Sequence, residues 1–131
     1  MSSGYLLDTN IAIAILINEG NAIEFIQQAN REKSGIYFST VSECEVFSGL
    51  KDEEHLHAEK LFTSKRCIDV TSEIAKMAGM IRRDQKIKGR NLKTPDALII
   101  ATAFILDLAL VSRDSDMQFV ERELEIPYTR I

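Results

Sequence analysis

Cysteine and histidine are scarce in this chain, whose 131 residues include two of each. Cys44 and Cys67 lack the spacing of a metal site and suggest no disulfide framework, so we expect two buried free thiols in a reduced, cytoplasmic setting. His55 and His57 are two residues apart on a polar segment, which excludes a local zinc pair and favours solvated positions. Neither histidine lies near a plausible nucleophile at a strand end, so no Ser/His/Asp or Cys/His catalytic set is recognisable.

Phosphate loops, membrane spans and secretory signals are also missing. No glycine-rich loop follows a strand-like run, which disfavours a nucleotide-cofactor fold. The apolar stretch 97–111 falls short of the roughly 20 residues that cross a bilayer, and Asp107 interrupts it. The first residues, Met1 to Gly4, carry no positive side chain and lead directly into Asp8. We therefore expect no secretory signal, no membrane association and a cytoplasmic location.

Neither acidic nor basic residues are in large excess over the other. The net charge is −4, with 45% hydrophobic and 27% charged residues, as in ordinary globular proteins. The length fits one domain, expected to span residues 1–131 and to bury its core without disulfides. The acidic balance argues against a surface that coats nucleic acid. It does not exclude a nuclease, because a metal-dependent site is itself acidic.

One segment runs against this acidic balance. Its basic residues are Arg82, Arg83, Lys86, Lys88, Arg90 and Lys93. Two interpretations remain open at this point. Charge runs are usually solvated helix ends and loops, whereas a local basic patch can steer a polyanion toward a site.

Strand-like runs alternate with helical patterns along the whole chain. The expected strands are residues 5–8, 36–39, 67–70 and 109–112, with an edge strand at 126–129 because it contains a proline. The expected helices are residues 10–17, 21–33, 41–50, 52–64, 72–86, 95–107 and 117–121, with Thr94 as an N-cap and Pro95 as a first helical residue. Such alternation predicts a parallel sheet covered by helices on both faces.

Four acidic residues occur where strand-like runs give way to loops or helices: Asp8, Glu45, Asp96 and Asp114. The carboxyl ends of parallel strands share one edge of the sheet, where ligands usually bind, so these side chains can converge. Three of them also have simple structural explanations. Asp8 can cap a helix, Asp96 can complement the dipole of a first helical turn, and Asp114 can form an Asx-turn.

Glu45 has no such explanation, because it lies inside a helix beside apolar residues. Glu43 and Glu45 are separated by about 200° around a helix of 3.6 residues per turn. If the helix is packed, one of the two faces inward, and we expect Glu45 to be that residue, paired or metal-bound. Gly49, four residues later, indicates either close approach of another backbone or a plain helix C-cap.

Several carboxylates at one point require a cation. Two like charges about 4 Å apart repel by roughly 4 kcal/mol at an effective dielectric constant of 20. A cluster of three or four opposes folding unless the groups are protonated or bridged. Hard oxygen ligands select Mg²⁺ or Mn²⁺. A site of this kind suits hydrolysis of a phosphodiester, because the metal activates a water and neutralises developing charge.

The segments around the four acids resemble the four motifs of PIN-domain ribonucleases. The matching segments, in family order, are Leu6-Leu7-Asp8-Thr9-Asn10; Ser39-Thr40-Val41-Ser42-Glu43-Cys44-Glu45 with Gly49-Leu50; Thr94-Pro95-Asp96-Ala97-Leu98-Ile99-Ile100-Ala101; and Leu110-Val111-Ser112-Arg113-Asp114-Ser115-Asp116 with Phe119. Each motif is weak alone. All four in order, from one end of the chain to the other, make a strong signal.

Small single-domain members of this family are typically the toxin of a VapBC-type toxin–antitoxin pair. The resemblance therefore implies a three-layer α/β/α fold with a central, mainly parallel sheet. It also implies Mg²⁺- or Mn²⁺-dependent endoribonuclease activity on RNA, homodimerisation, and inhibition by a small antitoxin. Two alternatives remain: a weakly active or inactive binding module in a DNA-binding complex with its antitoxin, and a housekeeping RNA-processing nuclease.

Transferred residue by residue, the motifs make Asp8, Glu45 and Asp96 the core metal ligands. Asp114 completes the acidic site, and Asp116 is a lesser candidate for that fourth position. Two flanking residues are expected to support the ligands. Ser112 stands where a hydroxyl often contacts the waters of the metal site, and Asn10 is expected to orient Asp8.

Overall fold

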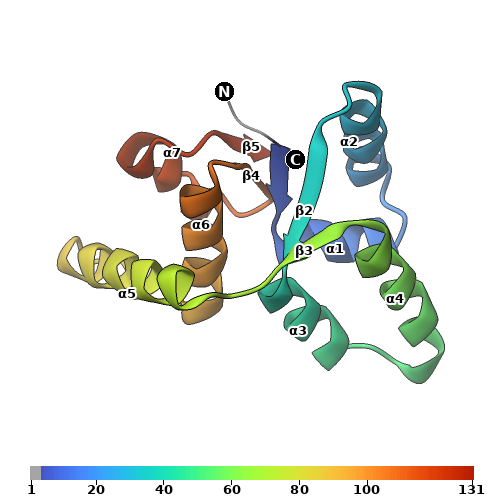
Figure 1. Ribbon diagram of the computed structural model, residues 1–131, viewed down its shortest axis with the longest axis horizontal. Coiled ribbons are helices and arrows are strands. Elements are labelled where there is room, and N and C mark those ends of the chain that lie inside the picture. Colours follow the sequence, from blue (N-terminus) through green and yellow to red (C-terminus); the bar gives the residue numbers. More distant parts are fainter. Residues whose placement is uncertain (1–3) are drawn as a thin grey trace.

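Five parallel strands form the centre of the protein, which we describe from a computed structural model of residues 4–131 (Figure 1). The strands are β1 (Gly4–Leu7), β2 (Gly35–Ser39), β3 (Arg66–Ile68), β4 (Ala109–Ser112) and β5 (Tyr128–Arg130). Their order is β3-β2-β1-β4-β5, and all neighbours are parallel. The chain builds one half of the sheet outward from β1 and then returns to build the other half. The switch point, where such folds bind ligands, therefore lies between β1 and β4.

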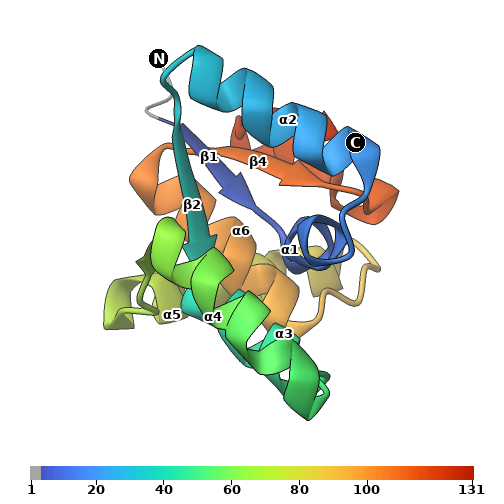
Figure 2. The same ribbon diagram turned by 90° about the vertical axis from the view of Figure 1, so that its right-hand side faces the viewer.

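Helices cover both faces of the sheet, which confirms the expected three-layer α/β/α fold. The helices within residues 4–131 are α1 (Thr9–Leu16), α2 (Gly20–Arg31), α3 (Thr40–Ser48), α4 (His55–Ser64), α5 (Ser72–Ile87), α6 (Thr94–Leu106) and α7 (Phe119–Leu124), with 3₁₀ turns η1 (Asp52–Glu54) and η2 (Ser115–Met117). Figures 1 and 2 show α5, α6 and α7 on one side of the sheet and α1, α2 and α4 on the other. Helix α3 leaves the end of β2 and packs against α1, α4 and α6.

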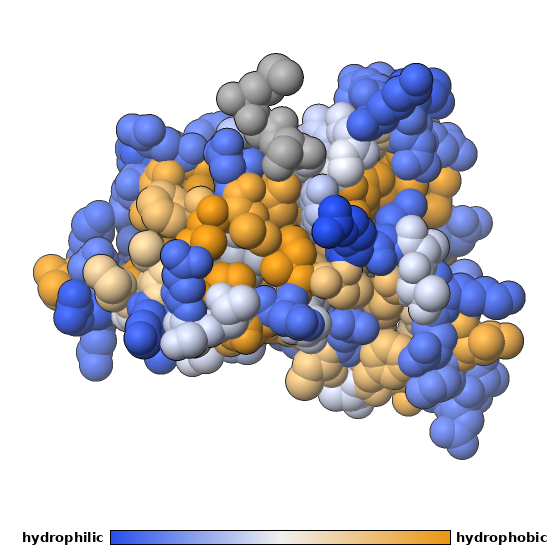
Figure 3. Space-filling view, viewed as in Figure 1, coloured by the Kyte–Doolittle hydropathy of each residue, from blue (hydrophilic) through white to orange (hydrophobic). Residues whose placement is uncertain are grey.

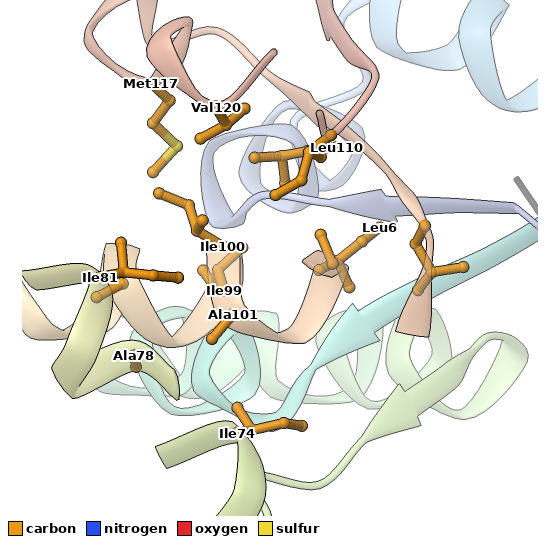
Figure 4. Close-up of a cluster of buried hydrophobic side chains, with 14 of the residues drawn as sticks. Leu6, Ile74, Ala78, Ile81, Ile99, Ile100, Ala101, Leu110, Met117 and Val120 are labelled. Atoms are coloured by element: carbon orange, nitrogen blue, oxygen red, sulfur yellow. The ribbon is translucent and has the colours of Figure 1, made fainter. Parts of the chain in front are cut away.

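The core consists of two clusters, one on each face of the sheet. Strand side chains alternate between them: Leu6 and Leu110 belong to the cluster under α5, α6 and α7, whereas Leu7 and Val111 belong to the cluster under α1, α2 and α4. Figure 4 shows the first cluster, in which Ile99 from α6 is fully buried. Each such side chain contributes about 1.5–3 kcal/mol by leaving water, so the two clusters fix the strand ends that carry the acids.

Several local expectations need correction. Helix α6 begins at Thr94, so the residue before it, Lys93, occupies the N-cap position and makes no capping hydrogen bond with its side chain. Both cysteines are free, but Cys44 is exposed rather than buried, because it lies on the outer side of α3. Cys67 is half-buried, and burial raises the pKa of its thiol to about 11.

Other expectations concern the surface and the start of the chain. His55 and His57 are both exposed, as expected of solvated side chains. Along residues 4–131, no helix is both long enough and apolar enough to cross a bilayer. The first three residues of the expected domain, which include most of the segment inspected for a secretory signal, lie outside the described residues.

Candidate active site

Asp8 lies at the switch point of the sheet, directly after β1. Its backbone N–H donates to the carbonyl of Val111 in β4 at 2.9 Å, which continues the strand pairing for one more residue. Its carboxylate accepts the backbone N–H of Thr9 at 2.8 Å and the hydroxyl of Ser112 at 2.7 Å. Asp8 is only 4% exposed. The carboxylate is therefore fixed by both central strands.

The simple structural explanations of three acids are all confirmed. Asp8 is the N-cap of α1. Asp96 lies in the first turn of α6, where a negative charge complements the helix dipole. The side chain of Asp114 accepts the backbone N–H of Asp116 at 2.9 Å and so forms the Asx-turn that opens η2. These roles place the carboxylates at helix starts beside the sheet edge, and they are compatible with a second, chemical role.

The expectation for Glu45 was wrong in one respect. Its side chain is exposed, whereas Glu43 is half-buried and its charge acts on the Cys67 thiol. The buried face of α3 is formed by Ser42 and Val46, and Glu45 lies at the margin of that face. At this rim position Glu45 still reaches the sheet edge, because its carboxylate accepts the hydroxyl of Thr9 at 2.6 Å.

Gly49 is a plain helix C-cap. It ends α3 with φ −107°, which any residue can adopt. A Cβ atom added there would meet only the carbonyl of Val46, at 3.9 Å. Of the two interpretations of this glycine, the C-cap is confirmed, and within residues 4–131 no backbone from another element approaches it closely.

The four acids act on one another electrostatically. The pKa of Asp96 is raised to about 6, first by burial and then by the charges of Asp8, Asp114 and Glu45. The pKa of Asp8 is also raised, mainly by burial and further by Glu45 and Asp114, against the lowering effect of its hydrogen bonds. Asp116 is not among the charges that shift either pKa. Asp8, Glu45, Asp96 and Asp114 are thus linked by their electrostatic effects, and Asp116 is outside that set.

The carboxylates converge without forming a closed set of ligands. As the side chains of residues 4–131 stand, no three His, Cys, Asp or Glu residues form a group that could hold a metal ion. The donor chemistry nevertheless fits a hard cation, because every acidic group at this edge offers carboxylate oxygen. Repulsion between the carboxylates, about 4 kcal/mol for a pair at 4 Å and a dielectric constant of 20, favours spread side chains.

Ser112 connects the two central strand ends. Its hydroxyl donates to Asp8 and accepts the backbone N–H of Asp114 at 3.1 Å. It also accepts the side-chain amide of Asn10 at 3.2 Å. Asn10 therefore contacts Ser112 rather than Asp8, and acts on the carboxylate through the serine. Ser112 itself is fully buried, so its hydroxyl serves the protein's own groups.

Tyr128 is a residue of the site that sequence reasoning missed. Its hydroxyl donates to the backbone carbonyl of Asp114. Burial raises the pKa of the phenol, and the charges of Asp114 and Asp8 add to this, so Tyr128 lies in the field of the same acids. The pairing of β5 with β4, in which Leu110 faces Tyr128, places it there. The only signal in the sequence was a tyrosine in an edge strand, which gives no register.

A cleft of about 770 Å³ opens beside the acids. Its wall includes Asp96, Asp114 and Asp116, and also the basic side chains of Arg90, Lys93 and Arg122. The remaining wall is largely polar and is formed by Gln85, Asn91, Leu92, Ser115, Met117, Gln118, Phe119 and Glu121. Part of the basic segment thus lies next to the acidic edge. The sequence alone did not show whether this segment lies beside the site or is a solvated helix end and loop.

Part of that basic segment is structural. The carboxylate of Glu123 in α7 accepts Lys88 and Arg90 at 2.6 Å each, and Gln85 at 3.0 Å. These hydrogen bonds, with that of Lys88 the strongest, lower the pKa of Glu123 to about 2. Gln85 is buried. The cluster therefore fastens the loop between α5 and α6 to α7, and so shapes one wall of the cleft.

Replacing Glu123 by Gln is expected to lower the free energy of unfolding by about 1–2 kcal/mol at pH 7, allowing for solvent screening of the half-exposed Lys88 and Arg90. A depressed pKa stabilises the fold above the unfolded value and loses that effect as pH falls. The difference between wild type and variant should therefore shrink from about pH 4.5 toward pH 2. Urea unfolding at pH 7 and pH 3 measures it. Glu121→Gln, exposed on the same helix, is the control, and an equal loss at both pH values would contradict the ion cluster.

Comparison with known proteins gives a consistent result. The family model described as PIN domain matches residues 5–123. Ribonuclease VapC10 of Mycobacterium tuberculosis is 30% identical over 107 residues, covering 82% of this chain and 80% of that protein. Ribonuclease VapC19 of the same organism is 27% identical over 123 residues, covering 94% and 98%. A crystal structure of DNA-bound VapBC from Salmonella typhimurium shares the fold, with TM-score 0.82, 21% identity and coverage of 99% and 98%.

Proposed function

Because this chain belongs to the PIN-domain family and its curated relatives are VapC ribonucleases, we propose that it is the toxin of a toxin–antitoxin pair. Its activity is that of an endoribonuclease, which hydrolyses phosphodiester bonds of RNA with Mg²⁺ or Mn²⁺. One observation carries the proposal. Acids from four separate segments lie close enough at this sheet edge that burial, together with the charges of Asp8, Asp114 and Glu45, raises the pKa of Asp96 to about 6.

Asp8, Glu45 and Asp96 are the proposed metal ligands, and Asp114 completes the site. Their coupling supports this assignment, because repulsion among the acids adds to the effect of burial on the pKa values of Asp8 and Asp96, and a cation relieves that repulsion. Asp116 remains the lesser candidate for the fourth position. It lines the cleft, but its backbone N–H holds the side chain of Asp114 in place instead.

Each supporting residue has a defined task in this mechanism. The bound cation supplies a water of lowered pKa and neutralises charge that develops on the phosphate. Ser112 and Thr9 donate to Asp8 and favour its ionised form. The Thr9 hydroxyl donates to Glu45 and lies 2.9 Å from the Ser42 hydroxyl. These two contacts hold Glu45 against the start of α1. These hydrogen bonds hold the carboxylates of Asp8 and Glu45 in place before RNA arrives.

The proposal includes partners and location. We propose a small antitoxin as the cognate partner, supported by the VapBC complexes that share this fold, and a single nuclease domain over residues 1–131 in the cytoplasm. We also propose a homodimer. Figure 3 shows apolar surface on the face seen in Figure 1, and exposed apolar side chains of α5 and α6 include Met80, Phe104 and Leu106.

The test of the proposed function is RNA cleavage by the purified chain with Mn²⁺ or Mg²⁺ and with EDTA. We expect cleavage only with metal, because the water nucleophile depends on it. The products should carry a 5′-phosphate and a 3′-hydroxyl, which an exonuclease specific for 5′-phosphate ends detects. Mapping the 5′ ends of cellular RNA after induced expression then identifies the substrate. Undiminished cleavage in EDTA, or 5′-hydroxyl products, would overturn the proposed chemistry.

A further inference from the structure

The wall of the cleft beside the acids carries both acidic and basic side chains. We propose that Lys93 and Arg122 form a phosphate-binding subsite there for single-stranded RNA. This inference rests on the proposed function and deepens it. The scissile phosphate lies at the acidic edge with the cation, and a neighbouring phosphate of the same strand lies between Lys93 and Arg122. The other basic residues of the 82–93 segment do not contribute to this subsite.

Contacts within the protein distinguish the basic side chains that are already held in place from those that can bind a phosphate. Lys88 and Arg90 each donate to Glu123 at 2.6 Å. Arg90 also lies over the ring of Phe119, 5.1 Å from its centroid. Arg82 donates from Nε to the carbonyl of Leu92 at 2.9 Å. These three side chains hold the loop between α5 and α6 in shape, so moving them to a phosphate would break existing contacts.

Lys93 is the basic residue whose charge acts on the acidic edge. It lines the cleft and is exposed. Its charge lowers the pKa of Asp96, against the three acids that raise it, so its ammonium group acts over the short range between cleft and carboxylates. A cation at this position can attract a phosphate without displacing the metal ligands.

Arg122 reaches the same cleft from a different element, α7. Its guanidinium lies 3.7 Å from Glu123, but its side chain is 74% exposed, and Glu123 already accepts three shorter hydrogen bonds. A contact of this length and exposure stabilises little. The guanidinium therefore remains able to bind a phosphate through two parallel hydrogen bonds.

The dimensions of the cleft indicate an unpaired strand. A volume of about 770 Å³ falls in the range of small-molecule sites, which suits a nucleotide and is too small to enclose a double helix. Asn91 and Gln118 on its wall carry amide donors and acceptors that can contact an unpaired base. The cleft thus offers charge for the backbone and amides for the base of a single strand.

Binding of a fluorescein-labelled single-stranded RNA oligonucleotide, followed by anisotropy in EDTA, tests the subsite without cleavage. We expect Lys93→Ala and Arg122→Ala each to raise Kd about 5- to 10-fold. Each should also reduce the slope of log Kd against log salt by about 0.7, the value for one phosphate contact on a single strand. Lys86→Ala and Arg83→Ala are matched controls from the same basic segment, outside the cleft wall, and should leave the slope unchanged.

A second measurement separates binding from chemistry. At saturating Mn²⁺ and at a pH well above the pKa of Asp96, the two cleft variants should raise KM and leave kcat near wild type, because the subsite binds the strand and not the reacting atoms. Hybridising the oligonucleotide to its complement should remove the difference between the variants and wild type. Equal effects of all four substitutions, no effect of the two cleft variants, or the same dependence with duplex RNA would overturn the subsite. Absence of cleavage by wild type with any metal would instead overturn the proposed function, and the EDTA binding result would still stand.

Discussion

Asp8→Asn is expected to abolish RNA cleavage, with a fall in kcat/KM of at least about 10³-fold. Loss of a metal ligand removes several kcal/mol of transition-state stabilisation, and about 4 kcal/mol corresponds to that factor. The variant should still fold, because Asn caps helices as well as Asp does, and Oδ1 can still accept the N–H of Thr9. Steady-state kinetics on a defined RNA, together with growth of a bacterial host that expresses the variant, measure the effect. The growth arrest that we expect from expression of the wild-type chain should be relieved.

Two further substitutions make this result specific. Asp114→Asn should also impair cleavage strongly, whereas Asp116→Asn should retain most of it, because the Asp116 charge does not act on the pKa of Asp8 or Asp96. Full cleavage by folded Asp8→Asn would contradict the assigned metal site. The reverse order for the other two variants would transfer the fourth position from Asp114 to Asp116.

Metal binding should stabilise the protein, and the metal-free protein should lose stability as pH rises from about 4 to 6. The pKa of Asp96 is raised from 3.8 to about 6 in the fold, so in that interval the folded state binds more protons than the unfolded state. Unfolding free energy then falls with pH. Above about pH 6 we expect the ionised carboxylates to bind Mn²⁺, and a concentration of 100 Kd would add about 2.7 kcal/mol. For a domain of this size the gain in Tm is on the order of 10 °C.

Thermal unfolding at pH 5 and pH 7, in EDTA and in Mn²⁺, measures both effects. The Glu123 cluster does not mask the trend, because its contribution is already complete above about pH 4.5. Asp96→Asn should flatten the pH dependence in EDTA and weaken the response to Mn²⁺. Asp84→Asn, exposed on α5, should change neither. If Tm in EDTA rose between pH 5 and pH 7 and Mn²⁺ had no effect, the electrostatic account of the acidic edge would be wrong.

The sequence predicted where the acidic residues lie relative to the strands, but it did not predict which side chains of α3 point toward the interior. Alternating strand and helix patterns located the strand ends that carry Asp8 and Asp114, and local side-chain chemistry identified Asp8 as a helix cap. Helical periodicity also separated Glu43 from Glu45 correctly. It could not show which of the two faces the interior, because α3 lies at the end of the sheet and not across its face. Glu45 reaches the site from an exposed position for that reason.

Contacts between segments that are distant in sequence were equally impossible to predict from the sequence. Lys88 and Arg90 look like their basic neighbours in the sequence, and only the approach of α7 reveals that Glu123 holds them. Tyr128 owes its place to the register of β5 against β4, which depends on the packing of both core clusters. The acids carry motif signals because each sits beside its own strand end. Glu123 and Tyr128, which lie outside those motifs and join one segment to another, carry none.

The hydrogen bond from Tyr128 to the Asp114 backbone also orders events during synthesis. Strand β5 follows every other strand in the chain, so the ribosome completes Asp8, Glu45, Asp96 and Asp114 before the residue that anchors the last of them. The loop that carries Asp114 gains its full support only after residues 128–130 have left the exit tunnel and paired with β4. The Asp114 corner of the acidic edge is therefore completed after the segments that carry the other three acids have been synthesised.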